Sequence, residues 1–423
     1  MSAPDFGPPE LSLPETTTPD IKGWCPGALR PMLAGDGWLV RIRPQGGTLS
    51  PAQAEGIARA AMAHGNGIID LSNRANLQLR GVRAQAHPAL IADLANLGLI
   101  DATPAAEAAR NILVTPFWLQ DDGTQTLATA LAAALAAAAA PESTAPEPTA
   151  PESHPAATTP LLPGKFGFAL DSGAAPVLAL SPADIRLERG PKGLILRPDG
   201  YALGRPTTLD TAITDALALV AWFLESGGGA PGRGRMAALI AAGACLPAGF
   251  TEPPLPPAAP PSPGLTGQGW LAALAFGQMT AAALHAIAAL NRPLRLTPWR
   301  MLLIEGAAPL PVIDGLITRA DNPLLRVSAC IGAPGCAQGL GETRALARRL
   351  APHLPPGQHL HISGCAKGCA HPGASAITLT ALPQGYGLIH DGTARARATT
   401  ILTAASLTRH PDLLSKAPHA PSL

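Results

Sequence analysis

An internal repeat limits the folds open to this chain more than any other feature of its sequence. The stretches that start at Gly37 and at Gly269 both begin Gly-Trp-Leu. Each continues to a Gly-x-[Leu/Met]-[Ser/Thr] segment, at residues 47–50 and 277–280, then to an Ala-rich helical stretch and two apolar strands. Coincidence between two Ala-rich helices is the alternative, but the matched order of Trp, Gly and Ser/Thr argues against it. The repeat predicts two duplicated halves around a pseudo-twofold axis.

Strand-like and helix-like segments alternate along the rest of the chain, which predicts a mixed α/β protein. The expected strands are 38–42, 67–71, 77–79, 193–197 and 376–379, and the expected helices are 52–64, 208–223 and 342–350. An apolar run at 127–140 is nearly all alanine, too short and too weakly hydrophobic to span a bilayer. We expect it to form an Ala-rich helix of a globular fold.

Two segments of biased composition interrupt this alternation. Residues 141–160 are rich in Pro, Ala, Glu, Ser and Thr and predict a flexible insertion, because such a segment cannot bury a core. Residues 226–264 combine Gly-rich and Pro-rich runs and predict a linker between the halves.

Charge and cysteine content narrow the class of function. The net charge is +1, from 30 basic and 29 acidic residues, which gives no overall attraction to nucleic acid or to an acidic membrane. The N-terminal region lacks the basic and apolar parts of a signal peptide, and six cysteines in 423 residues are too few for a disulfide-stapled scaffold. We therefore expect a cytoplasmic protein that binds neither nucleic acid nor membrane.

Four of the six cysteines lie near the C-terminus in two glycine-flanked pairs. The first pair encloses five residues, which is wide for structural zinc, and the second encloses three. Four thiolates in a reducing compartment suit a [4Fe–4S] cluster, and neighbouring glycines let backbone N–H groups approach its sulfurs. The pattern favours such a cluster over a zinc site or inert thiols. The predicted ligands are Cys330, Cys336, Cys365 and Cys369.

This cysteine spacing, on a chain with two repeated halves, resembles the sulfite/nitrite reductase superfamily. The resemblance covers nearly the whole chain and implies a fold of mixed α+β and α/β character, in which each half is a ferredoxin-like half-domain followed by an α/β lobe. It also implies a sirohaem beside the cluster. The expected division is an N-terminal extension (1–25), half-domain 1 (26–105), lobe 1 (106–225, with the insertion at about 141–160), a linker (226–264), half-domain 2 (265–310) and lobe 2 with the cluster cysteines (311–415).

Basic residues of the first half match motifs with which this superfamily binds tetrapyrrole carboxylates or an anionic substrate. The matches are Arg41-x-Arg43 before Gly46-Gly47, Arg74 within 72–78, Arg110-Asn111 followed by Pro116, and Lys165 within 162–166. The resemblance implies that Arg43, Arg74 and Lys165 are catalytic. It further implies that Arg41, Arg110 and Asn111 bind the cofactor and that Cys369 bridges the cluster and the sirohaem iron. Arginine suits this task because its fork is permanently charged and binds carboxylates through two hydrogen bonds.

For these arginines, and more so for Arg80 and Arg83, ordinary surface charge is the alternative interpretation. Arginine supplies 25 of the 30 basic residues, so some arginines reflect composition alone. Arg295 and Arg300 of the second half are weaker candidates for the same carboxylate-binding role.

Two departures separate the sequence from the reductases of this superfamily. Gly167 stands where they have a second lysine, and Ala366-Lys367-Gly368 stands where their second cysteine pair usually encloses Pro-Asn. With these departures and the segments 23–27, 35–37, 330–334 and 363–372, the sequence resembles the precorrin-3B synthases, the cobalamin-pathway branch. That resemblance implies a monooxygenase that hydroxylates precorrin-3A with O2 at a methine-bridge carbon and closes a lactone from a neighbouring acetate. The alternatives are a sirohaem-dependent sulfite or nitrite reductase and a non-catalytic tetrapyrrole-binding protein.

Monooxygenation needs two electrons, and the sequence offers no nucleotide-binding motif to supply them. No G-x-G-x-x-G opens a βαβ unit, and the Gly-rich run at 226–235 lies within the predicted linker. We therefore expect NADH to act indirectly, through a separate electron-donor reductase. A mononuclear non-haem iron or a sirohaem is the expected companion of the cluster, and His361 and His371 are candidate iron ligands.

Overall fold

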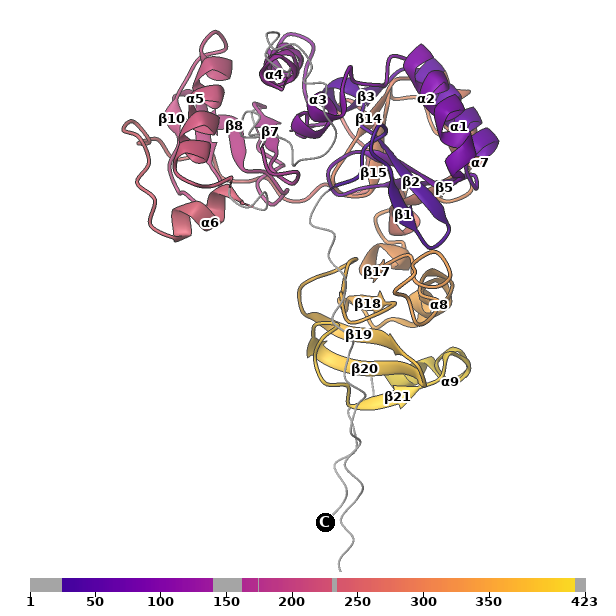
Figure 1. Ribbon diagram of the computed structural model, residues 1–423. Helices are drawn as coiled ribbons and strands as arrows, with labels where there is room; N and C mark the ends of the chain where they lie inside the picture. Colours follow the sequence, from indigo (N-terminus) through magenta and orange to yellow (C-terminus); the bar gives the residue numbers. More distant parts are fainter. Residues whose placement is uncertain (1–24, 140–161, 174, 230–233, 415–423) are drawn as a thin grey trace, which may run out of the picture. The chain divides into compact units, whose positions relative to one another are not determined.

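The structure, a computed structural model, describes residues 25–139, 162–173, 175–229 and 234–414. The described residues up to Leu325 form one compact unit, and those from Arg326 onward form another (Figure 1). The predicted N-terminal extension, apart from its last residue, and the predicted insertion at 141–160 lie outside the described residues.

Two antiparallel sheets in the first unit exchange strands with each other. The first sheet has the order β1-β2-β5-β4-β13, and the second has β11-β12-β15-β14-β3 with β16 beside β12. β3 (Thr48–Leu49) follows the first repeat's opening strand yet pairs with β14, whereas β13 (Gln278–Thr280) of the second repeat pairs with β4. This reciprocal exchange confirms the predicted duplication. The other strands are β1 (Met32–Ala34), β2 (Gly37–Ile42), β4 (Ile68–Leu71), β5 (Leu77–Val82), β11 (Gly264–Leu265), β12 (Gly269–Leu274), β14 (Leu294–Leu296), β15 (Met301–Glu305) and β16 (Leu316–Ile317).

Helices α1 (Pro51–His64) and α7 (Ala281–Ala288) pack side by side on these sheets (Figure 1). Each begins directly after its exchanged strand, where the hydroxyl of Ser50 or Thr280 accepts a backbone N–H of the first turn. Their buried faces consist largely of alanine, so the two helices approach closely. α2 (His87–Asn96) packs beside α1. One hydrophobic core, with residues from both repeats, underlies these helices.

An α/β lobe with the same strand arrangement occurs in each unit. In the first unit β6, β7 and β8 run parallel, and β9 and β10 return antiparallel. In the second unit β17, β18 and β19 run parallel, and β20 and β21 return antiparallel. The duplication therefore includes the lobes. The first lobe's strands are β6 (Ile112–Val114), β7 (Phe168–Asp171), β8 (Ile185–Gly190), β9 (Gly193–Pro198) and β10 (Arg205–Pro206); the second lobe's are β17 (Val327–Ala329), β18 (Leu360–Ser363), β19 (Ser375–Leu382), β20 (Gly385–Gly392) and β21 (Thr400–Leu402).

Helices complete both lobes, and none of the described helices is long and apolar enough to cross a membrane. The Ala-rich run forms α4 (Thr124–Ala138), and the predicted helices at 208–223 and 342–350 are α5 (Ala212–Glu225) and α8 (Arg344–Leu350). The remaining helices are α3 (Pro104–Ala109), α6 (Met236–Ala241) and α9 (Ala404–Arg409).

Part of the expected linker contacts the first lobe, and part of the expected lobe 2 joins the second repeat's sheet. α6 lies within 226–264, and Glu252 forms a backbone bridge with Gly204 of the first lobe. β16 pairs with β12, so Leu316–Ile317 extend the second repeat's sheet within the first unit. Hydrophobic patterning does not reveal such short pairings, because two-residue strands have no measurable period.

Candidate functional site

Arg41 and Arg43 lie on β2 and just beyond its end. Nε and Nη2 of Arg41 donate to Oε1 of Gln78, its partner on β5, at 3.1 and 2.6 Å. Arg43 is buried, and its Nη1 donates to the carbonyl of Glu107 at 2.9 Å and lies 3.5 Å from the Glu107 carboxylate. Burial lowers the pKa of both guanidiniums, to about 10 for Arg43. At about 10, the pKa of Arg43 leaves its guanidinium cationic at neutral pH.

Arg110 supports Arg43 from the end of α3. Its Nε and Nη2 donate to the two carboxylate oxygens of Asp101 at 2.8 and 2.7 Å, and Nη2 also donates to the Arg43 carbonyl at 2.9 Å. The Arg110 side chain is 7% exposed. Its guanidinium thus has a carboxylate partner inside the protein, and its binding of a tetrapyrrole stays a prediction.

Arg74, Asn111 and Lys165 are distant in sequence but meet at one place. Nη2 of Arg74, in the turn between β4 and β5, donates to the Lys165 carbonyl at 2.9 Å. Nδ2 of Asn111 donates to the next carbonyl, that of Phe166, at 2.9 Å. Lys165 itself is exposed. Two side chains of predicted importance therefore fix the backbone that carries the third.

Gly167 leaves no room for a side chain at this place. A Cβ on Gly167 would lie 2.8 Å from Nδ2 of Asn111 and 3.1 Å from Nη1 of Arg74. Both distances are shorter than ordinary contacts, and both neighbours are held by their hydrogen bonds. The second lysine of the reductases therefore cannot occupy this position unless Arg74 and Asn111 move.

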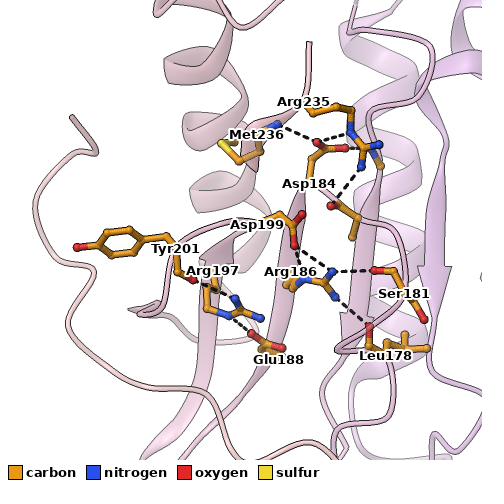
Figure 2. A network of polar contacts seen from close by, with 12 residues as sticks. Leu178, Ser181, Asp184, Arg186, Glu188, Arg197, Asp199, Tyr201, Arg235 and Met236 are labelled. Atoms are coloured by element: carbon orange, nitrogen blue, oxygen red, sulfur yellow. Dashed lines mark hydrogen bonds and ion pairs between the residues drawn. The ribbon is translucent and has the colours of Figure 1, made fainter. Parts of the chain in front are cut away.

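A fully buried carboxylate fixes the backbone of Gly167. Asp184 accepts the N–H of Gly167 at 3.0 Å, the N–H of Met236 at 2.9 Å and Nε of Arg235 at 2.8 Å. Figure 2 shows Asp184 between Arg235 and Met236. Arg235 also brings a positive charge toward Arg74, and this charge adds to burial in lowering the Arg74 pKa. The patterns of the sequence did not single out Asp184 or Arg235, since an isolated acid or base carries no periodic signal.

Arg186 anchors the loop before β8 within the same lobe (Figure 2). Its guanidinium donates to the carbonyls of Leu178 and Ser181 at 2.9 and 2.7 Å and forms an ion pair with Asp199. The loop that leads to Asp184 is therefore held at several points by buried polar contacts.

The structure brings Arg41, Arg43 and Arg74 within electrostatic reach of one another. The second repeat has no counterpart of this basic site, because Ala273 and Ala275 stand where the first has Arg41 and Arg43. The duplicated scaffold therefore carries the arginine pair of β2 on one side only.

The weaker arginine candidates either pair with acidic side chains or are exposed. Arg80 forms ion pairs with Asp36 and Asp70, and Arg295 pairs with Glu305 and stacks 3.7 Å above the Trp118 ring. Arg83 is exposed.

The four cysteines of the second unit follow two adjacent parallel strands. Cys330 follows β17, and Cys365 and Cys369 follow β18. The carboxyl ends of parallel strands meet at one edge, which is where α/β sheets bind ligands. The N–H of Gly364 lies 3.1 Å from Sγ of Cys330. A glycine N–H therefore approaches one of the predicted ligand sulfurs, and the approach of such groups to the sulfurs of a cluster stays a prediction.

The donor set of this edge fits a [4Fe–4S] cluster. All four cysteines are free thiols, and Cys330, Cys336 and Cys365 lie within electrostatic reach of Cys369. Among the described residues, no three His, Cys, Asp or Glu side chains converge as the ligands of a single metal ion must. A cluster with four irons takes one thiolate at each iron. Its four cysteine ligands are therefore spaced around the whole cluster and do not meet at a single metal ion.

Three histidines of the second unit lie close together. The rings of His361 and His371 lie 5.7 Å apart edge to face, and the rings of His371 and His359 lie 4.8 Å apart. The candidate iron ligands His361 and His371 are thus neighbours. Iron binding by these rings stays a prediction, because within the described chain they belong to no group of three metal-ligating side chains.

Comparisons with known proteins bear on both fold and family. Residues 30–97 match the model of the nitrite/sulfite reductase ferredoxin-like half domain. A precorrin-3B synthase from a Sinorhizobium species is 32% identical over 405 residues, which cover 88% of this chain and 83% of that protein. The structure of the Mycobacterium tuberculosis NirA protein matches with a TM-score of 0.56 and 18% identity, over 89% of this chain and 79% of that chain. The structural match supports the duplicated fold alone.

Proposed function

This chain belongs to the precorrin-3B synthase family, and from that premise we propose that it is an oxygen-dependent monooxygenase of cobalamin biosynthesis. The proposed reaction converts precorrin-3A to precorrin-3B. One atom of O2 becomes the new hydroxyl group and the other leaves as water, after uptake of two electrons and two protons. A neighbouring acetate of the substrate then closes a lactone.

The observation that carries this proposal is the one-sided basic site. Arg41, Arg43 and Arg74 share one region, and Lys165 adds a fourth cation there. Glu107 is the buried acid beside Arg43, and its negative charge balances one of these positive charges. A partly buried excess of positive charge favours a ligand with several carboxylates, and the rim of a precorrin carries acetates and propionates.

Three of these basic residues have a defined task in the proposed reaction. Arg74 binds a substrate carboxylate, because its own hydrogen bond to the Lys165 carbonyl fixes its orientation. Arg43, whose two Nη atoms donate to backbone carbonyls, adds positive charge from the buried side of the site. Lys165 is exposed and adds a mobile positive charge at the same place. By holding an acetate, these residues orient the carboxylate that closes the lactone.

The four cysteines are the proposed ligands of a [4Fe–4S] cluster, which supplies one-electron transfer when it is bound. We propose that the two electrons originate from NADH and arrive through a separate reductase.

Product analysis tests this proposal. Reconstituted protein is incubated with precorrin-3A, O2 and a chemical reductant, and the same protein is assayed for sulfite and nitrite reduction. We expect an oxygenated lactone and no reduction of either anion. Anion reduction without an oxygenated product would establish the alternative, a sirohaem-dependent reductase, despite the closed position at Gly167.

A further inference from the structure

We propose, building on the function proposed above, that Arg235 binds a second carboxylate of the tetrapyrrole, next to the carboxylate that Arg74 binds. Arg235 ends the Gly-rich run at 226–235, which has no part in the reaction proposed above. It belongs to the same compact unit as Arg74. The two arginines form a pair around Gly167, and the pair binds the acetate and the propionate of one pyrrole ring.

Short contacts connect both arginines to Gly167. The two oxygens of Asp184 accept the N–H of Gly167 at 3.0 Å and Nε of Arg235 at 2.8 Å. Nη1 of Arg74 lies 3.1 Å from the position that a Cβ of Gly167 would take. One glycine and one carboxylate therefore separate the two guanidiniums. Burial is the main cause that lowers the Arg74 pKa, and the positive charge of Arg235 adds to it, in agreement with this arrangement.

The guanidinium of Arg235 is held in place but keeps a free donor. Its Nε donates to the fully buried Asp184 (Figure 2), and its Nη2 makes a long contact of 3.5 Å with the Ala183 carbonyl. Among the described residues, Nη1 of Arg235 and Nη1 of Arg74 have no hydrogen-bond partner. Neither atom is one of the buried side-chain nitrogens that lack a partner, so solvent reaches both. A ligand can therefore reach them as well.

The charges around Gly167 favour a ligand with two carboxylates. Within the described chain, Asp184 is the one carboxylate bonded to either arginine, because Arg74 donates to a carbonyl. The exposed Lys165 adds a third positive charge. One acid thus faces three cations, and two carboxylates of one ligand would balance the excess. Each pyrrole ring of a precorrin presents such a pair, an acetate and a propionate on neighbouring carbons.

Two porphyrins that differ only in their acetates test the arginine pair. Uroporphyrin III, a stable tetrapyrrole with eight carboxylates, has an acetate and a propionate on every pyrrole ring. Coproporphyrin III has a methyl group in place of each acetate. Both are titrated by fluorescence against the full chain with its cluster reconstituted. We expect Arg235→Gln to weaken uroporphyrin binding roughly tenfold and coproporphyrin binding less than about threefold, because Arg74 still binds the propionate.

Two further variants separate ligand binding from a structural effect. Arg205 lies in the same lobe, is similarly exposed and pairs with Asp215 at 2.6 Å, so Arg205→Gln should change neither affinity. Arg235→Lys keeps a cation beside Asp184 but lacks the planar fork of arginine. It should lower the preference for uroporphyrin over coproporphyrin about threefold, and it provides the test if the glutamine variant does not fold.

The preference between the two porphyrins decides the outcome. A variant of Arg235 that loses affinity for both porphyrins equally, or for neither, would overturn the assignment but leave the proposed function intact. Absence of uroporphyrin binding by the parent chain would overturn both.

Discussion

Replacing Gly167 by alanine should damage the basic site more than its small size suggests. The new Cβ would lie 2.8 Å from Nδ2 and 3.0 Å from the carbonyl oxygen of Asn111, and 3.1 Å from Nη1 of Arg74. The carbonyl oxygen belongs to the backbone, and the two side chains are each held by a hydrogen bond. Nδ2 is hydrogen-bonded to the Phe166 carbonyl, and the Arg74 guanidinium to the Lys165 carbonyl. Relief of the overlap must therefore break or lengthen contacts that shape the site.

The expected size of the effect follows from these contacts. Overpacking of a filled site costs about 1–3 kcal/mol, and each hydrogen bond that is lost costs about 1 kcal/mol. We expect the free energy of unfolding to fall by about 2–3 kcal/mol. If Arg74 is displaced from one carboxylate contact, uroporphyrin affinity should fall roughly tenfold or more, which corresponds to about 1.4 kcal/mol.

Gly173→Ala is the matched control, because a Cβ at Gly173 meets no atom within 4 Å. It should change stability by less than about 0.5 kcal/mol. Urea denaturation and fluorescence binding measure both variants. Equal stability and equal affinity of the two alanine variants would refute the reasoning that Gly167 closes the site.

Three further predictions concern single charged groups. Arg74→Gln should weaken uroporphyrin binding roughly tenfold and reduce the dependence of this binding on salt, because a charge-assisted contact is lost. Fluorescence titration at several salt concentrations measures both effects. An unchanged salt dependence would count against a carboxylate contact. Burial raises the pKa of Asp171, which is 2% exposed, to about 6. A carboxyl whose pKa is raised by folding stabilises the folded state below its unfolded pKa, and this contribution is lost as the pH rises through 6. From pH 4 to pH 7 the loss should be about 2 kcal/mol, and Asp171→Asn should remove this part of the pH dependence in urea denaturation. A variant with the same pH profile as the parent would contradict this expectation. Lys367→Gln should lower the reduction potential of the reconstituted cluster, because a positive charge between Cys365 and Cys369 stabilises the reduced form. A redox titration followed by electron paramagnetic resonance measures this potential. An unchanged potential would exclude that role for Lys367.

The repeat predicted the duplicated halves, because each copy retained its Gly-Trp-Leu start and its capped helix. The exchange of β3 and β13 was not predictable from the chain. These strands have two and three residues, and what decides their pairing is the neighbouring half and not a local pattern. The sequence order of the strands therefore indicated the halves but not how they interlock.

The candidate site was predictable to a similar extent. Motif positions singled out Arg43 and Arg74, and both lie in the basic site. The two carboxylates that hold their surroundings were not predicted, because Glu107 lies in a short Ala-rich helix and Asp184 in a loop. Only tertiary structure shows that these two carboxylates are buried and hold the site together.

Mass spectrometry of the product formed under isotopically labelled O2 tests the central claim most directly. The purified chain, with its cluster reconstituted and a chemical reductant present, is given precorrin-3A. If the chain is the proposed monooxygenase, the product gains one oxygen atom, and that atom carries the label. A product without label, or unchanged precorrin-3A together with reduction of sulfite by the same preparation, would contradict the proposed function.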